Sequence, residues 1–154
     1  MIEVAGDLWT YPADARVITT NGYVNIKGEA VMGRGCAKEA AVRWPNLSVY
    51  LGGAIKRDGN RVRFVNAEYL SRLGSPADFD LVFYPVKHHW REQADLMLIV
   101  QSAEDLKVLA DRFNWSEVVM PRPGSGNGRL QWSYVKPHIE GILDDDRFRV
   151  IHYG

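Results

Sequence analysis

The sequence predicts an α/β sandwich built around a mixed, mostly parallel sheet. Short apolar runs bounded by glycine, proline, asparagine or charged residues recur along the 154 residues, as is typical of strands. Segments with the helical spacing of apolar residues lie between many of these runs, and such alternation favours a sheet covered by helices. Glycine-rich segments lie at the ends of predicted strands, where sheets of this kind bind ligands.

Six short apolar runs are predicted to be strands. They cover residues 2–5, 17–20, 62–65, 79–84, 117–120 and 148–153. Apolar residues at helical spacing over residues 36–44 predict a helix that Pro45 ends. The same spacing over residues 99–113 predicts a second helix, with Asp95 as its N-cap. A third helix is predicted to begin at Pro137, because the first position of a helix needs no N–H.

The chain is predicted to be a single domain, residues 1–154, because its length suits one domain and it shows no internal repeat, linker or low-complexity tract. Residues 21–34 are predicted to form a long polar loop, and residues 52–60 a turn between two elements. Long ordered loops inside compact domains are often functional. The loop at 21–34 is therefore a candidate part of a site.

The composition is that of a soluble globular protein, with 46% apolar and 25% charged residues. No segment approaches the roughly 20 apolar residues of a membrane span, so no membrane association is expected. The first residues show no basic segment followed by an apolar one, so no cleaved export signal is expected. Cys36 is the single cysteine and can form no internal disulfide, which suits a reducing compartment. We therefore expect a cytoplasmic protein.

Charge is balanced, with 19 lysines and arginines against 19 aspartates and glutamates. The molecule as a whole offers no long-range field to a polyanion, which disfavours a general DNA-binding protein. Any attraction for phosphate must therefore be local. The candidate groups lie in one run and beside the glycine-rich segments: Lys87, His88, His89, Arg91, Arg34, Arg122 and Arg129.

The histidines and Cys36 do not suggest a metal site. His88 and His89 are adjacent, so on an extended chain they point to opposite faces. No pair of ligands has the spacing of a zinc site. We expect neither a metal nor a cofactor, and we expect Cys36 to be a small core residue of an alanine-rich helix.

Residues 124–128 read Gly-Ser-Gly-Asn-Gly and follow the strand predicted at 117–120. Glycine at alternate positions lets the backbone turn successive N–H groups toward an anion. Gly33 and Gly35 precede the helix predicted at 36–44, whose N-terminus adds a positive end. Two such loops on one domain suggest a ligand with a diphosphate, and so nucleotide chemistry. Neither loop has the spacing of a P-loop or a dinucleotide-binding fingerprint, which disfavours an NTPase and a nicotinamide dehydrogenase.

Three segments resemble the macrodomain family, whose α/β fold binds ADP-ribose. They are Gly6-Asp7-Leu8 after the first strand, Asn21 followed after an insertion by residues 31–35 (Val-Met-Gly-Arg-Gly), and residues 121–132 (Pro-Arg-Pro-Gly-Ser-Gly-Asn-Gly-Arg-Leu-Gln-Trp). The likeness covers nearly the whole chain. It implies a macrodomain-like three-layer α/β/α sandwich.

A run at residues 83–91, Phe-Tyr-Pro-Val-Lys-His-His-Trp-Arg, narrows this resemblance. It is similar to the Pro-x-Lys-x-His-Trp-Arg run of DarG-type macrodomains, whose lysine is needed for activity. The resemblance is to the branch that holds these DNA ADP-ribosyl glycohydrolases, which act on thymidine in DNA, and terminal ADP-ribose protein glycohydrolase, which acts on glutamate. It implies that Lys87 is the catalytic residue.

The resemblance also implies the residues that bind ADP-ribose. Asp7 would accept a hydrogen bond from the adenine amino group, beside the N–H of Leu8. Tyr153 would stack on the adenine, and Asn21 would face the distal ribose. The remaining positions are Met32, Gly33, Arg34 and Gly35 in one loop and Gly124, Ser125, Gly126, Asn127 and Gly128, which would hold the diphosphate, in the other.

The implied function is an ADP-ribosyl hydrolase that removes ADP-ribose from a modified nucleobase such as thymidine, or from an acidic protein side chain. Lys87 would attack the opened distal ribose when neutral, or stabilise or protonate the departing group when charged. Terminal ADP-ribose protein glycohydrolase has an aspartate where this chain has Gly128, so its two-residue mechanism is not carried over. Glu29 in the long loop is a candidate for the missing carboxylate.

Two other functions are kept as alternatives. One is a non-catalytic reader that binds ADP-ribose, and the other is a phosphatase that acts on a phosphate ester of ADP-ribose. For the hydrolase, the partner is ADP-ribosylated DNA or protein, and an antagonistic ADP-ribosyltransferase would attach the modification. The protein is expected to act as a monomer.

Overall fold

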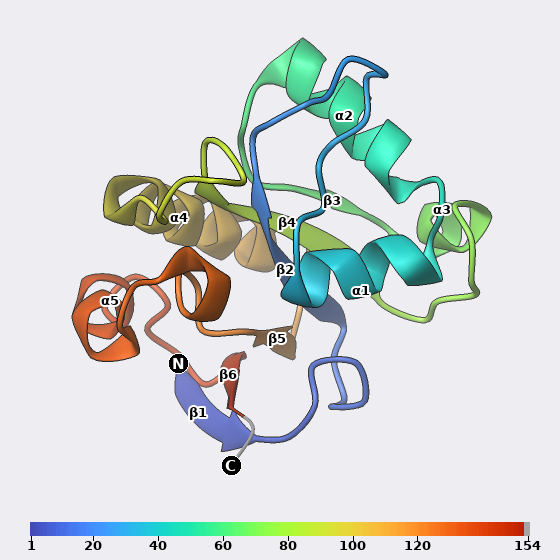
Figure 1. The fold of residues 1–154 in the computed structure, drawn as a ribbon. Helices are drawn as coiled ribbons and strands as arrows, with labels where there is room; N and C mark the ends of the chain where they lie inside the picture. The colour runs from blue at the N-terminus through green and yellow to red at the C-terminus, as the bar shows by residue number, and fades with distance from the viewer. Residues whose placement is uncertain (153–154) are drawn as a thin grey trace.

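The computed structural model describes residues 1–152 and contains a six-stranded sheet with helices on both faces (Figure 1). The strands are β1 (Ile2–Ala5), β2 (Ala15–Asn21), β3 (Arg63–Val65), β4 (Asp80–Lys87), β5 (Val118–Met120) and β6 (Phe148–His152). Their order is β1-β6-β5-β2-β4-β3, and every neighbouring pair is parallel except β3 with β4. The mixed, mostly parallel sheet predicted from the sequence is therefore confirmed.

The helices divide between the two faces of this sheet (Figure 1). They are α1 (Gly35–Arg43), α2 (Leu47–Asp58), α3 (Ala67–Arg72), α4 (Leu96–Arg112) and α5 (Trp132–Ile139), with a short 3₁₀ turn, η1 (Gly126–Gly128). The prediction of Asp95 as the N-cap of α4 is confirmed, because its carboxylate accepts a hydrogen bond from the N–H of Met97 at 3.0 Å. Among the described residues, no helix is both long and apolar enough to cross a membrane.

Side chains on the central strands alternate between two cores. On β4, Val82 and Tyr84 join the core beneath α4 and α5, whereas Leu81 and Phe83 join the core beneath α1, α2 and α3. All four side chains are fully buried. This alternation follows from the two-residue repeat of a strand, and it gives the three-layer sandwich that was predicted.

The expected start of the third helix is wrong. Pro137 lies inside α5, which begins at Trp132. Proline at this place removes a hydrogen bond to the carbonyl one turn earlier. Val135 and Ile139, one turn apart, are both fully buried against the core. Their packing positions the helix and overrides the local preference of proline.

The turn predicted at residues 52–60 is also wrong, because the chain stays helical in α2 as far as Asp58. Gly52 is needed there for close approach: a Cβ at this position would lie 2.1 Å from the carbonyl oxygen of Gly28. The glycine therefore lets the long loop after β2 pack directly on α2. The chain turns only at Gly59, where φ is +90°.

Candidate ADP-ribose site

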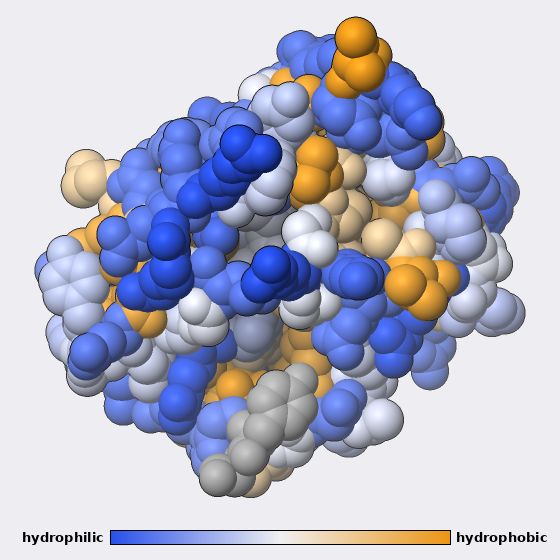
Figure 2. Space-filling view, in the orientation of Figure 1, coloured by the Kyte–Doolittle hydropathy of each residue, from blue (hydrophilic) through white to orange (hydrophobic). Residues whose placement is uncertain are grey.

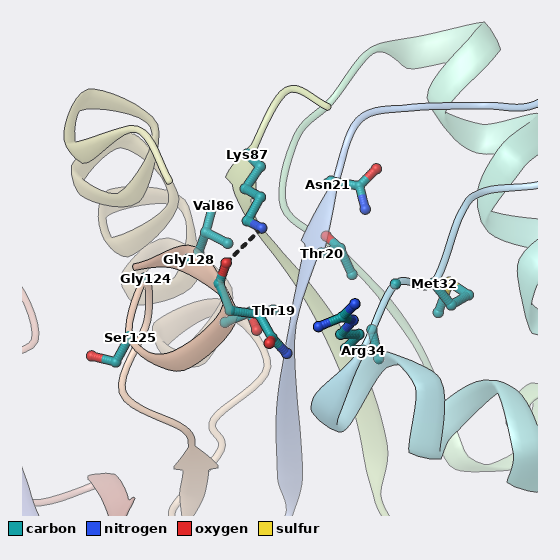
Figure 3. Close-up of a pocket in the computed structure, with 13 residues that line it drawn as sticks. Thr19, Thr20, Asn21, Met32, Arg34, Val86, Lys87, Gly124, Ser125 and Gly128 are labelled. Carbon is teal, nitrogen blue, oxygen red and sulfur yellow. Dashed lines mark hydrogen bonds between the residues drawn. The ribbon is translucent and has the colours of Figure 1, made fainter. Parts of the chain in front are cut away.

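A cleft lies at the carboxyl edge of the sheet, where β2 and β4 end between the two glycine-containing loops (Figure 3). It has a volume of about 90 Å³ and is open to solvent. The lining residues are Thr19, Thr20, Asn21, Met32, Gly33, Arg34, Ala37, Val86, Lys87, Gly124, Ser125, Asn127 and Gly128. Segments more than 100 positions apart in the sequence thus form one site, because the parallel strands all end at this edge.

Hydrogen bonds at the end of β4 fix the backbone of Lys87. In the parallel pair β2–β4, Asn21 stands opposite Lys87 after a register shift between Thr20 and Asn21. The carbonyl of Lys87 accepts two hydrogen bonds, from the N–H of Gly22 at 3.1 Å and from Nδ2 of Asn60 at 3.0 Å. The Lys87 side chain therefore projects into the cleft from a fixed base.

The ammonium group of Lys87 meets carbonyls rather than carboxylates. Its Nζ donates to the carbonyl of Asn127 at 2.8 Å (Figure 3). It also donates to the carbonyl of Trp90 at 3.4 Å. No ion pair involves Lys87 within residues 1–152. Burial lowers the pKa of Lys87, and the positive charge of Arg129 lowers it further. A neutral amine is therefore easier to reach here than on an ordinary surface lysine.

Asn21 is almost fully buried, at 8% exposed, and both ends of its amide are used. Its Nδ2 donates to the carbonyl of Val31 at 2.8 Å, and its Oδ1 accepts from the N–H of Tyr23 at 2.9 Å. These bonds fix the path of the long loop beside the cleft. The amide oxygen keeps a second lone pair, which is what a contact with the distal ribose would use.

The two glycine-containing loops face each other across the cleft. A Cβ at Gly35, where φ is +65°, would lie 3.3 Å from Nδ2 of Asn127. Gly124 has φ of +84°, and a Cβ there would lie only 2.6 Å from Cδ1 of Ile99 on α4. The first turn of α1 has neither a side-chain cap nor an acidic residue. Its free N–H groups therefore favour an anion in the cleft.

Most of the predicted site residues meet in this cleft. Lining it are Lys87, Asn21, Met32, Gly33, Arg34, Gly124, Ser125, Asn127 and Gly128. Gly35 lies close to the side chain of Asn127, which lines the cleft. Gly126 lines an adjoining hollow. The hydroxyl of Ser125 is buried and has no hydrogen-bond partner among the described residues, and it points away from Lys87 and Asn21 (Figure 3).

The residues expected at the adenine end lie apart from this cleft. Asp7 is exposed, and its carboxylate accepts a hydrogen bond from the N–H of Trp9 at 2.7 Å. The side chain of Leu8 is buried in the core beneath α1. Tyr153 lies outside the described residues.

The sequence interpretation missed Thr19 and Thr20. Their signal was their place at the end of a predicted strand, since α/β sheets bind ligands there. Glu29 does not line the cleft. Its part of the loop is tied to α2 instead, where the N–H of Ala30 donates to the carbonyl of Ser48 at 2.9 Å. The structure therefore gives no support to Glu29 as a substitute for the carboxylate that Gly128 lacks.

The candidate phosphate-binding groups divide into side chains that contact a carboxylate and side chains that form no ion pair among the described residues. Arg122 pairs with Glu3 at 3.0 Å, and His88 pairs with Asp95 at 2.8 Å. Three others form no ion pair within residues 1–152 and line a second hollow, of about 450 Å³, together with Trp90, Gly126 and Asn127: these are Arg34, Arg91 and Arg129.

The titratable groups offer no metal centre in the described part of the chain, where no three histidine, cysteine, aspartate or glutamate side chains lie close enough to hold an ion. Cys36 is partly buried, with its Sγ 3.5 Å from Oγ1 of Thr19. Burial raises the pKa of the Cys36 thiol, which makes a reactive thiolate unfavourable.

Known proteins are similar to this chain in both sequence and fold. No family model matches the chain. The chain is 30% identical over 135 residues to a Mycobacterium tuberculosis protein named DNA ADP-ribosyl glycohydrolase, and 29% identical over 143 residues to a Thermus aquaticus protein of the same name. These matches cover 88% and 92% of this chain but 36% and 37% of the two proteins. The chain thus spans about a third of the length of the curated relatives it matches.

A solved structure identifies which part of such a protein this chain resembles. The macrodomain of Mycobacterium tuberculosis DarG superposes with a TM-score of 0.77 at 27% identity, covering 97% of this chain and 95% of that one. The chain belongs to the macrodomain family. Within that family its similarity is to the DarG branch, as the run around Lys87 predicted.

Proposed function

We propose that this macrodomain is an ADP-ribosyl glycohydrolase that releases ADP-ribose from a modified nucleobase, with Lys87 as its catalytic residue. The observation that carries the proposal is a lysine of lowered pKa at one end of a cleft whose walls are two glycine-containing loops with no acidic residue in the turns that they begin. The name of the relatives, DNA ADP-ribosyl glycohydrolase, supports a nucleobase as the group released.

The proposal assigns each part of ADP-ribose to a set of residues in or beside the cleft. The diphosphate binds between the start of α1 and the loop at residues 124–128, since both offer N–H groups and no carboxylate. The distal ribose then lies toward Lys87 and Asn21, at the ends of β4 and β2. Asp7 would receive the adenine amino group at the outer end of the site.

Lys87 acts at the anomeric carbon of the distal ribose. The reaction passes through a transition state with oxocarbenium character. Neutral Lys87 adds to this carbon as the bond to the nucleobase breaks, and the proton that the amine gives up goes to the departing base. Water then replaces the amine, which releases ADP-ribose and restores the lysine.

The residues that line the described cleft include no aspartate or glutamate. Ordinary glycoside hydrolysis uses two carboxylates, one as acid and one as base or nucleophile. That mechanism lacks its groups here, and position 128, where a related enzyme carries an aspartate, is Gly128. This absence supports a mechanism centred on the lysine amine.

A panel of three substrates tests the proposal: a thymidine oligonucleotide and a glutamate-containing protein, both ADP-ribosylated, and a phosphate ester of ADP-ribose. We expect the oligonucleotide to lose its ADP-ribose, measured by mass spectrometry, and the other two to react at least tenfold more slowly. An ADP-ribosyltransferase that modifies the same base would be the functional antagonist. If free ADP-ribose binds while no substrate is turned over, the protein is a reader and the proposal fails.

A further inference from the structure

We propose that Arg34, Arg91 and Arg129 bind backbone phosphates of the nucleic-acid strand that carries the modified base. This rests on the proposed function, because it concerns what is attached to the base that the enzyme releases. It goes beyond that function by assigning a hollow that adjoins the ADP-ribose cleft to the flanking strand.

The hollow lined by these arginines adjoins the reacting end of the cleft. It shares Arg34 and Asn127 with the cleft. Lys87 donates hydrogen bonds to the carbonyls of Asn127 and Trp90, and both of these residues line the hollow. A group attached to the distal ribose beside Lys87 therefore has the hollow next to it. Figure 2 looks onto this face, where strongly hydrophilic side chains border a recess.

The arginines of the hollow differ from most arginines of the protein in having no carboxylate partner in the described part of the chain. Seven others form ion pairs: Arg57, Arg61, Arg63, Arg72, Arg122, Arg147 and Arg149. Within residues 1–152, the side chain of Arg129 donates only to the carbonyl of Arg91, at 3.3 Å. Unpaired guanidinium groups around one hollow suit phosphate, whose oxygens match their paired donors.

Arg91 packs against a row of aromatic side chains beside this hollow. Its Cζ lies 4.6 Å from the centre of the Trp90 ring. The Trp90 ring stacks on His89 with 5.6 Å between centroids and 25° between planes, and His89 lies 4.5 Å from Tyr23. The stack reduces the entropy that Arg91 would lose on binding. Trp90 and Tyr23 also remain 39% and 37% exposed, so their edges can contact bases, which favours a nucleic-acid strand over an acidic peptide.

Binding of an unmodified strand tests the surface without any turnover. The probe is a short labelled thymidine oligonucleotide at low ionic strength, followed by fluorescence anisotropy. We expect Arg91→Glu to weaken its binding by about tenfold and to flatten the dependence on salt. Arg112→Glu is the matched control, because Arg112 is the last residue of α4 and lies at the end of the sheet opposite the cleft. It also lacks an ion pair among the described residues. Equal weakening by both variants, or no binding by the wild-type protein, overturns the proposal.

Turnover gives a second and separable readout. We expect the ratio of kcat/KM on an ADP-ribosylated oligonucleotide to that on an ADP-ribosylated nucleoside to fall by about tenfold in Arg91→Glu and to stay unchanged in Arg112→Glu. If the ratio is unchanged in Arg91→Glu while both substrates are still turned over, the proposed strand-binding surface is wrong and the proposed function stands. If neither substrate reacts but oligonucleotide binding depends on Arg91, the proposed function fails and the surface stands.

An acidic peptide distinguishes a nucleic-acid surface from a general anion surface. We expect a peptide of the same net charge to compete at least tenfold more weakly than the unmodified oligonucleotide, because it has no bases to contact Trp90 and Tyr23. Equal competition would overturn the assignment to a strand.

Discussion

Two lysines at opposite edges of the sheet meet opposite surroundings. Lys107 on α4 has Asp111, Asp144 and Asp145 at 3.7, 3.4 and 3.1 Å, and the hydrogen bond to Asp145 is the main cause of its raised pKa. Among the described residues, Lys87 at the end of β4 has only carbonyl partners, and its pKa is lowered, first by burial and then by Arg129. Equal numbers of acidic and basic residues thus conceal an uneven distribution of charge.

The arginines follow the same division. Arg147 pairs with Asp111 at 2.7 Å and with Asp145 at 2.8 Å, where α4 ends and β6 begins. Arg91 instead lies on the face of an aromatic ring. The comparison teaches that charges paired inside the protein support the fold, whereas the charges left unpaired at the carboxyl edge are available to a ligand.

The largest expected effect separates the two lysines directly. Lys87→Ala should lower the release of ADP-ribose by about 10²- to 10⁴-fold, because it removes the reacting amine. Its affinity for ADP-ribose should change by less than about threefold. Single-turnover assays and calorimetric titration with ADP-ribose measure the two quantities.

Lys107→Ala is the control for this prediction. It removes the same kind of side chain from the edge that holds the ion pairs, and we expect its turnover to match the wild type. If both variants lose turnover equally, the loss reports damage to the fold rather than to catalysis.

The next effect concerns the backbone of the carboxyl edge. Gly124→Ala should lower the free energy of unfolding by about 1–3 kcal/mol, since φ is +84° and the new Cβ would lie 2.6 Å from Ile99. Gly53→Ala is the matched control: Gly53 is exposed in α2, and a Cβ there meets nothing within 4 Å. It should raise the free energy of unfolding by about 0.5–1 kcal/mol. Urea denaturation with the opposite order of stabilities would contradict this account.

A smaller effect is expected at the paired edge. Arg147→Ala should lower the free energy of unfolding by at most about 1 kcal/mol, and by less at high salt, because its partner Asp111 is exposed and its partner Asp145 is partly exposed. Arg112→Ala, at the same end of α4 but without an ion pair in residues 1–152, should stay within about 0.5 kcal/mol of the wild type. Equal stabilities of the two variants at low salt would show that the Arg147 pairs contribute nothing.

The smallest expected effect is a shift in pH dependence. Burial and Arg129 both disfavour the ammonium form, so the pKa of Lys87 lies below the ordinary value. The rate of turnover should therefore rise with pH as neutral Lys87 forms, through an apparent pKa below about 10.4. Arg129→Ala removes one of the two causes and should move this rise upward by a fraction of a pH unit, whereas Arg112→Ala should not. A rate that falls with pH would assign the chemistry to the ammonium form instead.

Local sequence patterns predicted the sheet and part of the helices. The end of α1 before Pro45 and the capping of α4 by Asp95 depend on neighbours within one turn, and both were predicted correctly. Gly52 and Pro137 were misread, because the first serves contact with a distant loop and the second lies in a helix held by buried side chains. Propensity describes the chain alone, and packing overrode it at both positions.

The amino-acid sequence by itself determined the alternation of strands and helices, the two glycine-containing loops and the run around Lys87, since each is a pattern within a short stretch. Only the tertiary structure decided which cations are paired. Arg122 and Arg129 both lie beside the same glycine-containing loop, yet Arg122 meets Glu3 on β1, 119 positions away, while Arg129 meets no carboxylate among the described residues. The physical reason is that ion pairing depends on distance in space, and the order of strands in the sheet sets those distances.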